Sequence, residues 1–134
     1  MAKKRKKKSE STKVGEKLDL AWAKITKIRA GNKCEICGQT HNLNSHHIFG
    51  RKNKSVRWSL SNCCVLCPNH HLFSSEFSAH QTPTAFTIWI IGERGEEWHE
   101  DLMILANAPK KWTLSEKEQL LEEFEEMQRE ICSE

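Results

Sequence analysis

Residues 42–71 read NLNSHHIFGRKNKSVRWSLSNCCVLCPNHH, and this stretch decides the expected fold. A short strand candidate at 42–49 contains a histidine pair, and a polar, basic loop follows at 50–59. Residues 63–67 are apolar and suit a second strand. Pro68 then begins a helix over about 68–78, because proline ends a strand and suits the first turn of a helix. This order predicts a ββα unit, in which a two-stranded antiparallel hairpin is followed by a helix.

A long helix is expected before this unit. Apolar residues recur at helical spacing from Leu18 through Trp22 to Ile28, which predicts a helix over about 12–29. Gly31 lies where a C-cap glycine belongs. The tryptophan and leucine side chains of this stripe are expected to face the core.

Further helices are expected after the unit. Thr82-Pro83 begins one of them, since threonine caps a helix and proline fits its first position. Residues 96–106 predict another helix. Ser115-x-x-Glu118 has the spacing of a capping box for an amphipathic last helix with an acidic outer face. The expected class is therefore α+β and mostly helical.

The chain of 134 residues suits one compact domain. We expect a disordered basic tail at 1–12 and a single domain at 13–134, with its ββα core at about 42–80 and a helical part at 82–134. The longest apolar stretch, residues 86–91, is too short to span a bilayer, and the N-terminus lacks the apolar core of a signal peptide. These features favour a cytoplasmic protein that does not enter membranes.

The charges are distributed unevenly along the chain. Residues 1–60 hold 16 Lys and Arg against 4 acids, whereas residues 61–134 hold 5 against 14. A basic first half is typical of a protein that binds a polyanion, although a solubilising tail and an acidic helix would give the same asymmetry.

Six cysteines point to a metal site, because thiols stay reduced where no secretory signal directs the chain outside. Cys34-x2-Cys37 and Cys67-x2-His70 are two short-spaced ligand pairs that match structural zinc. Cys64-x2-Cys67 is an equally good pair by spacing. Cys64 and Cys67 would face opposite sides of a strand, which favours His70 as the fourth ligand and leaves Cys63 and Cys64 structural. Buried free cysteines are the alternative interpretation.

Four further polar residues surround the same hairpin. His46 and His47 are adjacent on a strand and must face opposite sides, so one can bind a metal while the other reaches a water molecule. Asn62 opens the second strand, and an amide oxygen can accept a hydrogen bond from an imidazole and fix which ring nitrogen is free as a base. His71 follows the expected zinc ligand.

The chain resembles the HNH (ββα-metal) endonuclease superfamily, and small stand-alone bacteriophage members in particular. The resembling residues are Cys34-x2-Cys37, His46-His47-Ile48-x-Gly50-Arg51, Arg57-Trp58, Asn62 and Leu66-Cys67-x2-His70-His71, with a weaker match through His80-x2-Pro83-x2-Phe86-x2-Trp89. The match covers roughly residues 18–90. The order and spacing of these residues make the resemblance specific.

The resemblance implies a role for each matching residue. His46 and His71 would bind a catalytic divalent cation (Mg²⁺, Mn²⁺ or Ni²⁺), His47 would be the general base, and Asn62 would orient it. A further ligand common in the family falls on Ser75, and hydroxyls are poor ligands. Either a break near residues 74–77 returns His80 to the site, which we favour, or the cation has two protein ligands completed by water and phosphate.

The expected substrate is DNA, cut with low sequence specificity to give 5′-phosphate and 3′-hydroxyl ends. Arg51, Lys52, Lys54 and Arg57 lie on the loop between His47 and Asn62, where they could contact phosphates. Trp58 is expected to anchor that loop to the core. A monomer is expected, located in the host cytoplasm if a phage encodes it.

Two rival functions stay open at this point. A non-catalytic, zinc-binding DNA-binding module would explain the cysteines and the basic half, but not the four polar residues beside them. Alternatively, the acidic last helix could dock a partner, for example a phage packaging or recombination protein.

Overall fold

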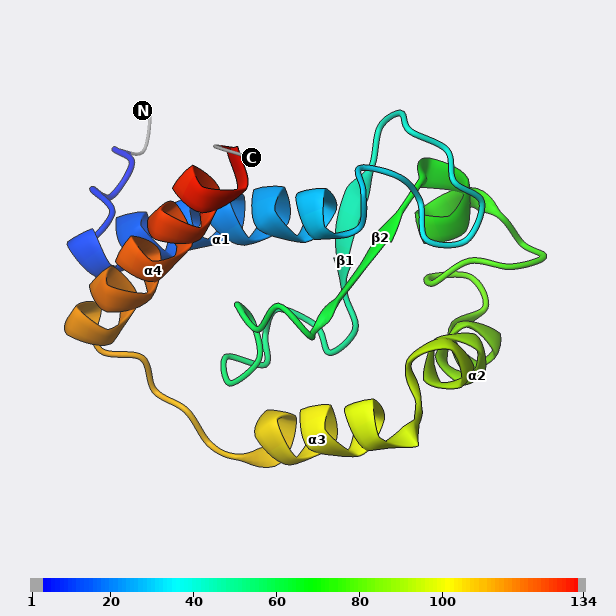
Figure 1. The fold of residues 1–134 in the computed structure, drawn as a ribbon. Helices are drawn as coiled ribbons and strands as arrows, with labels where there is room; N and C mark the ends of the chain where they lie inside the picture. The colour runs from blue at the N-terminus through cyan, green and yellow to red at the C-terminus, as the bar shows by residue number, and fades with distance from the viewer. Residues whose placement is uncertain (1–3, 133–134) are drawn as a thin grey trace.

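The computed structural model describes residues 4–132 and has a mixed α+β fold that is about 53% helical (Figure 1). The elements in chain order are α1 (Glu10–Arg29), β1 (Asn44–His47), β2 (Cys63–Leu66), η1 (Asn69–Phe73), α2 (Pro83–Arg94), α3 (Glu96–Asn107) and α4 (Leu114–Cys132). In Figure 1, α1 and α4 pack together at one end, the hairpin crosses the middle, and α2 and α3 lie beyond it. The mixed class, the helical majority and the antiparallel hairpin are as the sequence predicts.

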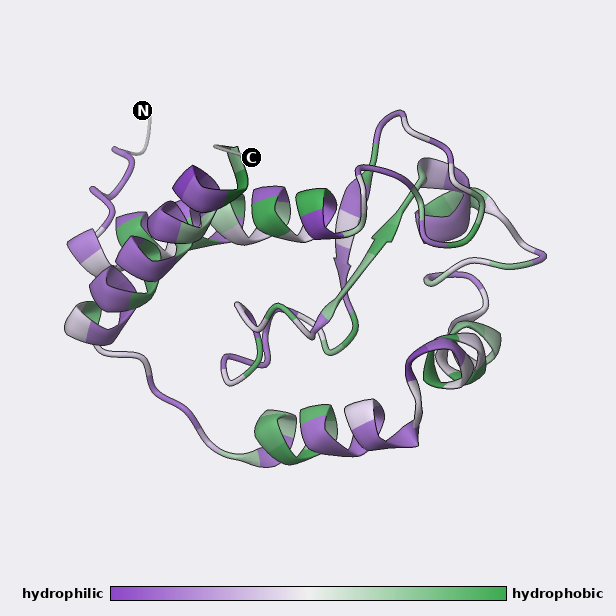
Figure 2. Cartoon of the chain, in the orientation of Figure 1, coloured by the Kyte–Doolittle hydropathy of each residue, from purple (hydrophilic) through white to green (hydrophobic). Residues whose placement is uncertain are grey.

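The hairpin separates two hydrophobic clusters because side chains alternate along each strand. The strands are antiparallel, with His46 opposite Cys64 and His47 opposite Cys63. Cys63 and Val65 face the cluster formed by α1 and α4. Cys64 and Leu66 face the cluster around α2. All four residues of β2 are buried, and Figure 2 shows β2 as hydrophobic beside a hydrophilic β1.

Helix α1 has well-formed ends, and it begins earlier than expected. The hydroxyl of Ser9 accepts a hydrogen bond from the Thr12 amide, which caps the N-terminus, so residues 10–12 of the expected tail are helical. At the other end, the amides of Gly31 and Asn32 donate to the carbonyls of Ile28 and Lys27, which forms a Schellman motif. Gly31 has a φ of +74°, the conformation that this motif requires. Residues 1–3 of the expected tail lie outside the described residues.

Helix α4 packs on α1 through the buried ring of Phe124. Its capping box is formed by Thr113 and Glu116 instead of Ser115 and Glu118. The Thr113 amide donates to the Glu116 carboxylate, and the Glu116 amide donates to the Thr113 hydroxyl; each donor–acceptor distance is 3.1 Å. Both pairs have the motif's spacing, so spacing alone does not distinguish them. Figure 2 shows the hydrophilic outer face of α4.

The prediction of a helix over 68–78 is wrong. The chain forms only the short π-helical turn η1 there and then changes direction. Ser74 is extended (φ −70°, ψ 122°), and its hydroxyl accepts hydrogen bonds from the amides of Glu76 and Phe77. Serine side chains that bind nearby backbone groups compete with helical hydrogen bonds. The expected ββα unit is therefore realised only as a hairpin followed by one short turn.

The segment after this turn comes back alongside η1. The amide of Ala79 donates to the His70 carbonyl over 2.8 Å, and that of His80 donates to the His71 carbonyl over 3.1 Å. These two bonds fix residues 79 and 80 beside residues 70 and 71. The described helices include none with the length and apolar character that a membrane crossing needs.

Candidate metal centres and active site

Three cysteines and one histidine converge between the first turn after α1 and the start of η1. The ligand atoms of Cys34, Cys37, Cys67 and His70 all lie within 4.8 Å of one another. The Cys37 and Cys67 sulfurs are 3.7 Å apart, and Nδ1 of His70 is 3.3 Å from Cys67 and 3.8 Å from Cys34. Tetrahedral zinc with ordinary bond lengths would place two sulfurs about 3.8 Å apart and a sulfur and a nitrogen about 3.5 Å apart. This cluster could hold a metal ion such as zinc.

The turn that carries Cys34 and Cys37 favours a thiolate at Cys34, whereas burial raises the pKa of Cys37. Burial of Cys34 opposes ionisation, but backbone amides of Cys37, Cys67 and Ile36 point at its sulfur and lower its pKa overall. The amide of Gly38 closes the turn on the Cys34 carbonyl over 2.9 Å, and Gly38 has a φ of +78° that a side chain would strain. A metal-bound cysteine is a thiolate, so these amides favour the ligating form.

Cys63 and Cys64 lie elsewhere, as the alternation of the strand predicts. Both side chains are buried, Cys63 toward α1 and Cys64 in the cluster around α2. Burial raises the pKa of Cys63 to about 11 and raises that of Cys64 further. Both thiols are therefore protonated at neutral pH, and His70, not Cys64, lies with Cys34, Cys37 and Cys67 in the group that could hold a metal ion.

A second cluster consists of three histidines. The ligand nitrogens of His46 on β1, His71 on η1 and His80 on the returning segment lie within 4.8 Å of one another. Nε2 of His71 and Nε2 of His80 are 3.0 Å apart. They border a cavity of about 240 Å³ that Asn44, Ser45, His47, Gly50 and Arg51 also line. The break after η1 brings His80 to His71, as the favoured alternative predicted.

Burial and neighbouring imidazoles disfavour the charged forms of His46 and His71. Burial lowers the pKa of His46 to about 3, and the nearby His71, His80 and His47 contribute to this decrease. Burial also lowers the pKa of His71, with His80 contributing. A neutral imidazole has the free lone pair that a metal ligand needs, and imidazole nitrogens suit transition metals. The three histidines could therefore hold a metal ion.

His47 faces the opposite side of β1, as the alternation predicts. Its ring stacks on Trp22 of α1, with ring centroids 3.9 Å apart and an interplanar angle of 10°. Its Nε2 lies 2.9 Å from the Arg57 carbonyl oxygen, which can only accept a hydrogen bond. Nε2 therefore carries the proton, and in the neutral ring Nδ1 is free. Burial lowers the pKa of His47 below its ordinary 6.5, so the ring is neutral at neutral pH.

Asn62 does not orient His47 as expected, because its side chain bonds to the backbone of Phe49 and Val56 instead. Asn62 is fully buried, and its amide oxygen accepts a hydrogen bond from the Phe49 amide over 2.7 Å. Its NH₂ group donates to the carbonyls of Phe49 and Val56. Asn62 thus ties together the two ends of the loop between the strands, and the backbone carbonyl of Arg57 on that loop orients His47.

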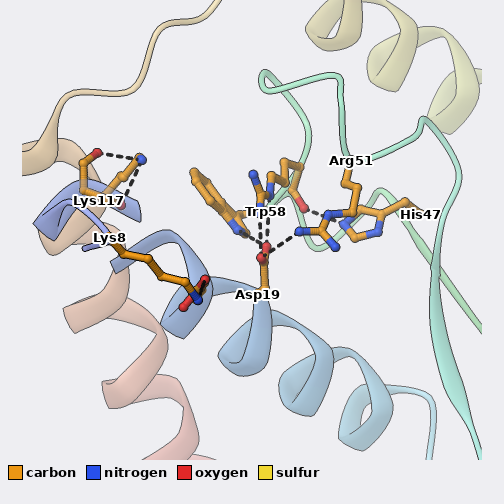
Figure 3. Close-up of polar contacts among 9 residues, drawn as sticks. Lys8, Asp19, His47, Arg51, Trp58 and Lys117 are labelled. Carbon is orange, nitrogen blue, oxygen red and sulfur yellow. Dashed lines mark hydrogen bonds and ion pairs between the residues drawn. The ribbon is translucent and has the colours of Figure 1, made fainter. Parts of the chain in front are cut away.

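The basic loop is attached to α1 through Asp19, a residue that the sequence analysis missed. Asp19 accepts two hydrogen bonds from Arg57 (2.6 and 3.0 Å) and one from Trp58 (2.9 Å), and Arg51 lies at 3.4 Å (Figure 3). Burial opposes ionisation of Asp19, but Arg57 and Trp58 outweigh it and lower its pKa. Asp19 lies three residues before Trp22 on the same helix face, which is the signal that could have revealed it.

The four expected phosphate contacts therefore differ in availability. Asp19 engages the guanidinium of Arg57 at 2.6 Å and pairs more loosely with Arg51 at 3.4 Å. The side chain of Arg51 is 65% exposed and borders the histidine cavity. Lys52 and Lys54 are exposed. Trp58 is buried and anchors the loop, as predicted.

Comparison with known proteins found no matching family model, no matching curated protein and no matching solved structure.

Proposed function

We propose that this chain is a metal-dependent endonuclease of the HNH type that hydrolyses DNA phosphodiester bonds. The observation that carries the proposal is the group of His46, His71 and His80 at an open cavity that His47 and Arg51 also line. Three imidazoles whose ligand nitrogens lie within 4.8 Å of one another suit a cation site, and His47 and the positively charged Arg51 border the same cavity. The resemblance of the sequence to HNH endonucleases supports the same function.

The two clusters would then have different tasks. Cys34, Cys37, Cys67 and His70 would hold zinc and fasten the turn after α1 to the end of the hairpin, since structural zinc sites are closed by four protein ligands. His46, His71 and His80 would leave positions open on a second divalent cation. When bound, that cation would polarise the scissile phosphate and stabilise the negative charge on the leaving 3′ oxygen.

His47 acts as the general base in this proposal. Its free Nδ1 accepts a proton from a water molecule, whose oxygen then forms a bond to phosphorus while the bond to the 3′ oxygen breaks. The 3′ oxygen takes a proton from solvent, so the products have 5′-phosphate and 3′-hydroxyl ends. The Arg57 carbonyl keeps the proton of the resting ring on Nε2, and stacking on Trp22 fixes the plane of the ring.

A non-catalytic zinc module is the second candidate, because the cysteine cluster and the basic loop would be sufficient for it. It gives no reason for His46, His71 and His80 to meet. The acidic outer face of α4 would suit a docking partner in addition to either function.

A plasmid-nicking assay with Mn²⁺ tests the proposal. We expect the zinc-loaded protein to convert supercoiled DNA to nicked or linear forms, and His47→Ala to reduce the rate by about 10²–10⁴-fold. His41→Ala, which removes an exposed histidine, is the matched control and should retain the rate. Equal absence of cleavage in the wild type and His47→Ala, despite full zinc content, would refute the nuclease and favour the module.

A further inference from the structure

A second cavity, of about 410 Å³, lies where the basic loop meets the first half of α1 and the start of α4. Its lining is rich in cations. The residues that border it are Ser11, Thr12, Gly15, Glu16, Arg51, Lys54, Arg57, Trp58, Lys111, Trp112 and Lys117. Most of these residues lie outside the part of the sequence that resembles HNH endonucleases, including Lys117 of α4 and the two residues, Lys111 and Trp112, that precede this helix.

The cations of this basic cavity exceed the acids that could neutralise them. Glu16 is the acid among the lining residues, and Lys8 already pairs with it over 2.6 Å. Asp19 engages Arg57. Within the described residues 4–132, no carboxylate lies within 4 Å of the ammonium groups of Lys54, Lys111 or Lys117. The cavity therefore carries unneutralised positive charge.

Two tryptophan rings form an apolar part of the cavity lining. The ring of Trp58 is 5% exposed and packs edge-on against Trp112, with centroids 5.2 Å apart. The Lys117 ammonium lies 5.8 Å from the Trp58 ring and donates to the carbonyl and hydroxyl of Ser11. A low-dielectric wall beside fixed cations strengthens attraction for an anion.

Arg51 lines both the basic cavity and the histidine cavity, so the two cavities are neighbours. Figure 3 shows Arg51 between His47 on one side and Trp58 and Lys117 on the other. A chain molecule that carries phosphates at regular intervals would place one phosphate at the histidines and another in the basic cavity. A mononucleotide or a free phosphate would fill only one of them.

We propose that the basic cavity binds a backbone phosphate of the same DNA strand whose scissile phosphate lies at His46, His71 and His80. This inference rests on the proposed nuclease function for the identity of the strand. Lys54, Lys111 and Lys117 supply the charge, and Arg51 bridges the two phosphates. The sequence-independent contact would position the strand without reading its bases.

Binding of a fluorescent DNA duplex to the full chain, measured by anisotropy over a range of salt concentrations without added Mg²⁺ or Mn²⁺, tests the inference. We expect Lys54→Gln/Lys111→Gln to weaken binding about tenfold and to lower the slope of log Kd against log salt by about 1–2. Lys24→Gln/Lys33→Gln removes the same charge from exposed lysines beyond the basic cavity and should change neither quantity.

A second variant blocks the cavity without changing its charge. A Cβ at position 15 would lie 3.6 Å from the Trp58 ring and 3.8 Å from the Lys117 ammonium, so the side chain of Gly15→Leu would enter the basic cavity. It should weaken DNA binding similarly while α1 stays helical by circular dichroism. Equal weakening by the two lysine pairs, or wild-type binding by both cavity variants, would overturn the inference.

Inorganic phosphate distinguishes a strand from a free anion. Millimolar phosphate should quench the tryptophan fluorescence only weakly in the wild type, and the duplex should quench it at far lower concentration. Equal affinity for the two would overturn the strand assignment. The proposed nuclease function and this inference can fail separately. If the cavity variants weaken DNA binding but the wild type does not cleave DNA, only the nuclease function is refuted. If the wild type cleaves DNA and neither cavity variant changes the cleavage rate, only the inference is refuted.

Discussion

At the scale of single residues, Asn62 has the clearest structural task. It is buried without any exposed surface, and it makes three hydrogen bonds to the backbone at Phe49 and Val56. Asn62→Ala would leave these groups without their partner, and we expect a loss of about 2–4 kcal/mol in the free energy of unfolding. Denaturant unfolding measures it, with Gln119→Ala as an exposed control. A loss under about 0.5 kcal/mol would contradict the role of Asn62 in closing the loop.

Asp19 couples the basic loop to α1, and its effect should depend on pH. The folded pKa of Asp19 lies below 3.8, so its stabilisation is complete above that value and is lost as the pH falls through the folded pKa. Asp19→Asn should therefore cost about 1–2 kcal/mol at pH 7 and progressively less in acid. Unfolding measured from pH 7 to pH 3 tests this prediction. A cost that stays constant over this range, or one shared by exposed Glu118→Gln, would count against it.

The candidate ligands could be read from the sequence, but their supporting contacts could not. Spacing was sufficient for Cys34 and Cys37, and strand alternation placed His46 and His47 on opposite sides. The contact of Asp19 with Arg57 was missed because the two residues lie 38 positions apart in the chain. The contact of His47 with the Arg57 carbonyl, 10 positions away, was missed for the same reason. Short-range patterns carry no information about such contacts.

At the scale of elements, the break after η1 decides whether a third histidine reaches the site. Residues 68–78 contain proline, then apolar and polar residues that also suit a helix, so local propensity predicts one. The backbone contacts of Ser74 and the return bonds at residues 79 and 80 outweigh that propensity. The sequence could suggest the break only through the spacing of His80 from His71.

Helix α1 contains a glycine that costs stability without serving a turn. Gly15 lies inside the helix, and a Cβ there would make ordinary contact with Trp58 at 3.6 Å. Gly15→Ala should therefore raise the free energy of unfolding by about 0.5–1 kcal/mol, because alanine favours the helix more than glycine does. Chemical denaturation checks this prediction. A destabilised variant would show that the contact with Trp58 is tighter than the structure indicates.

At the scale of the whole molecule, residues 4–132 form three hydrophobic clusters in place of one large core. The cysteine cluster belongs to the one around α2, where Cys34 and Cys67 are buried. Removal of the metal with a chelator should lower the thermal midpoint by at least about 10 °C, since structural zinc supplies folding free energy. Circular dichroism with measured zinc content tests it. Cys37→Ser should lose zinc, and Cys132→Ser, outside the cluster, should keep it.

The central claim is that His46, His71 and His80 bind a cation distinct from that of the cysteine cluster. Anomalous diffraction from crystals of the zinc-loaded protein soaked in Mn²⁺, recorded at the zinc edge and at longer wavelength, measures this most directly. We expect zinc among Cys34, Cys37, Cys67 and His70, and manganese among the three histidines. Manganese elsewhere, or no manganese at a concentration that supports cleavage, would contradict the account.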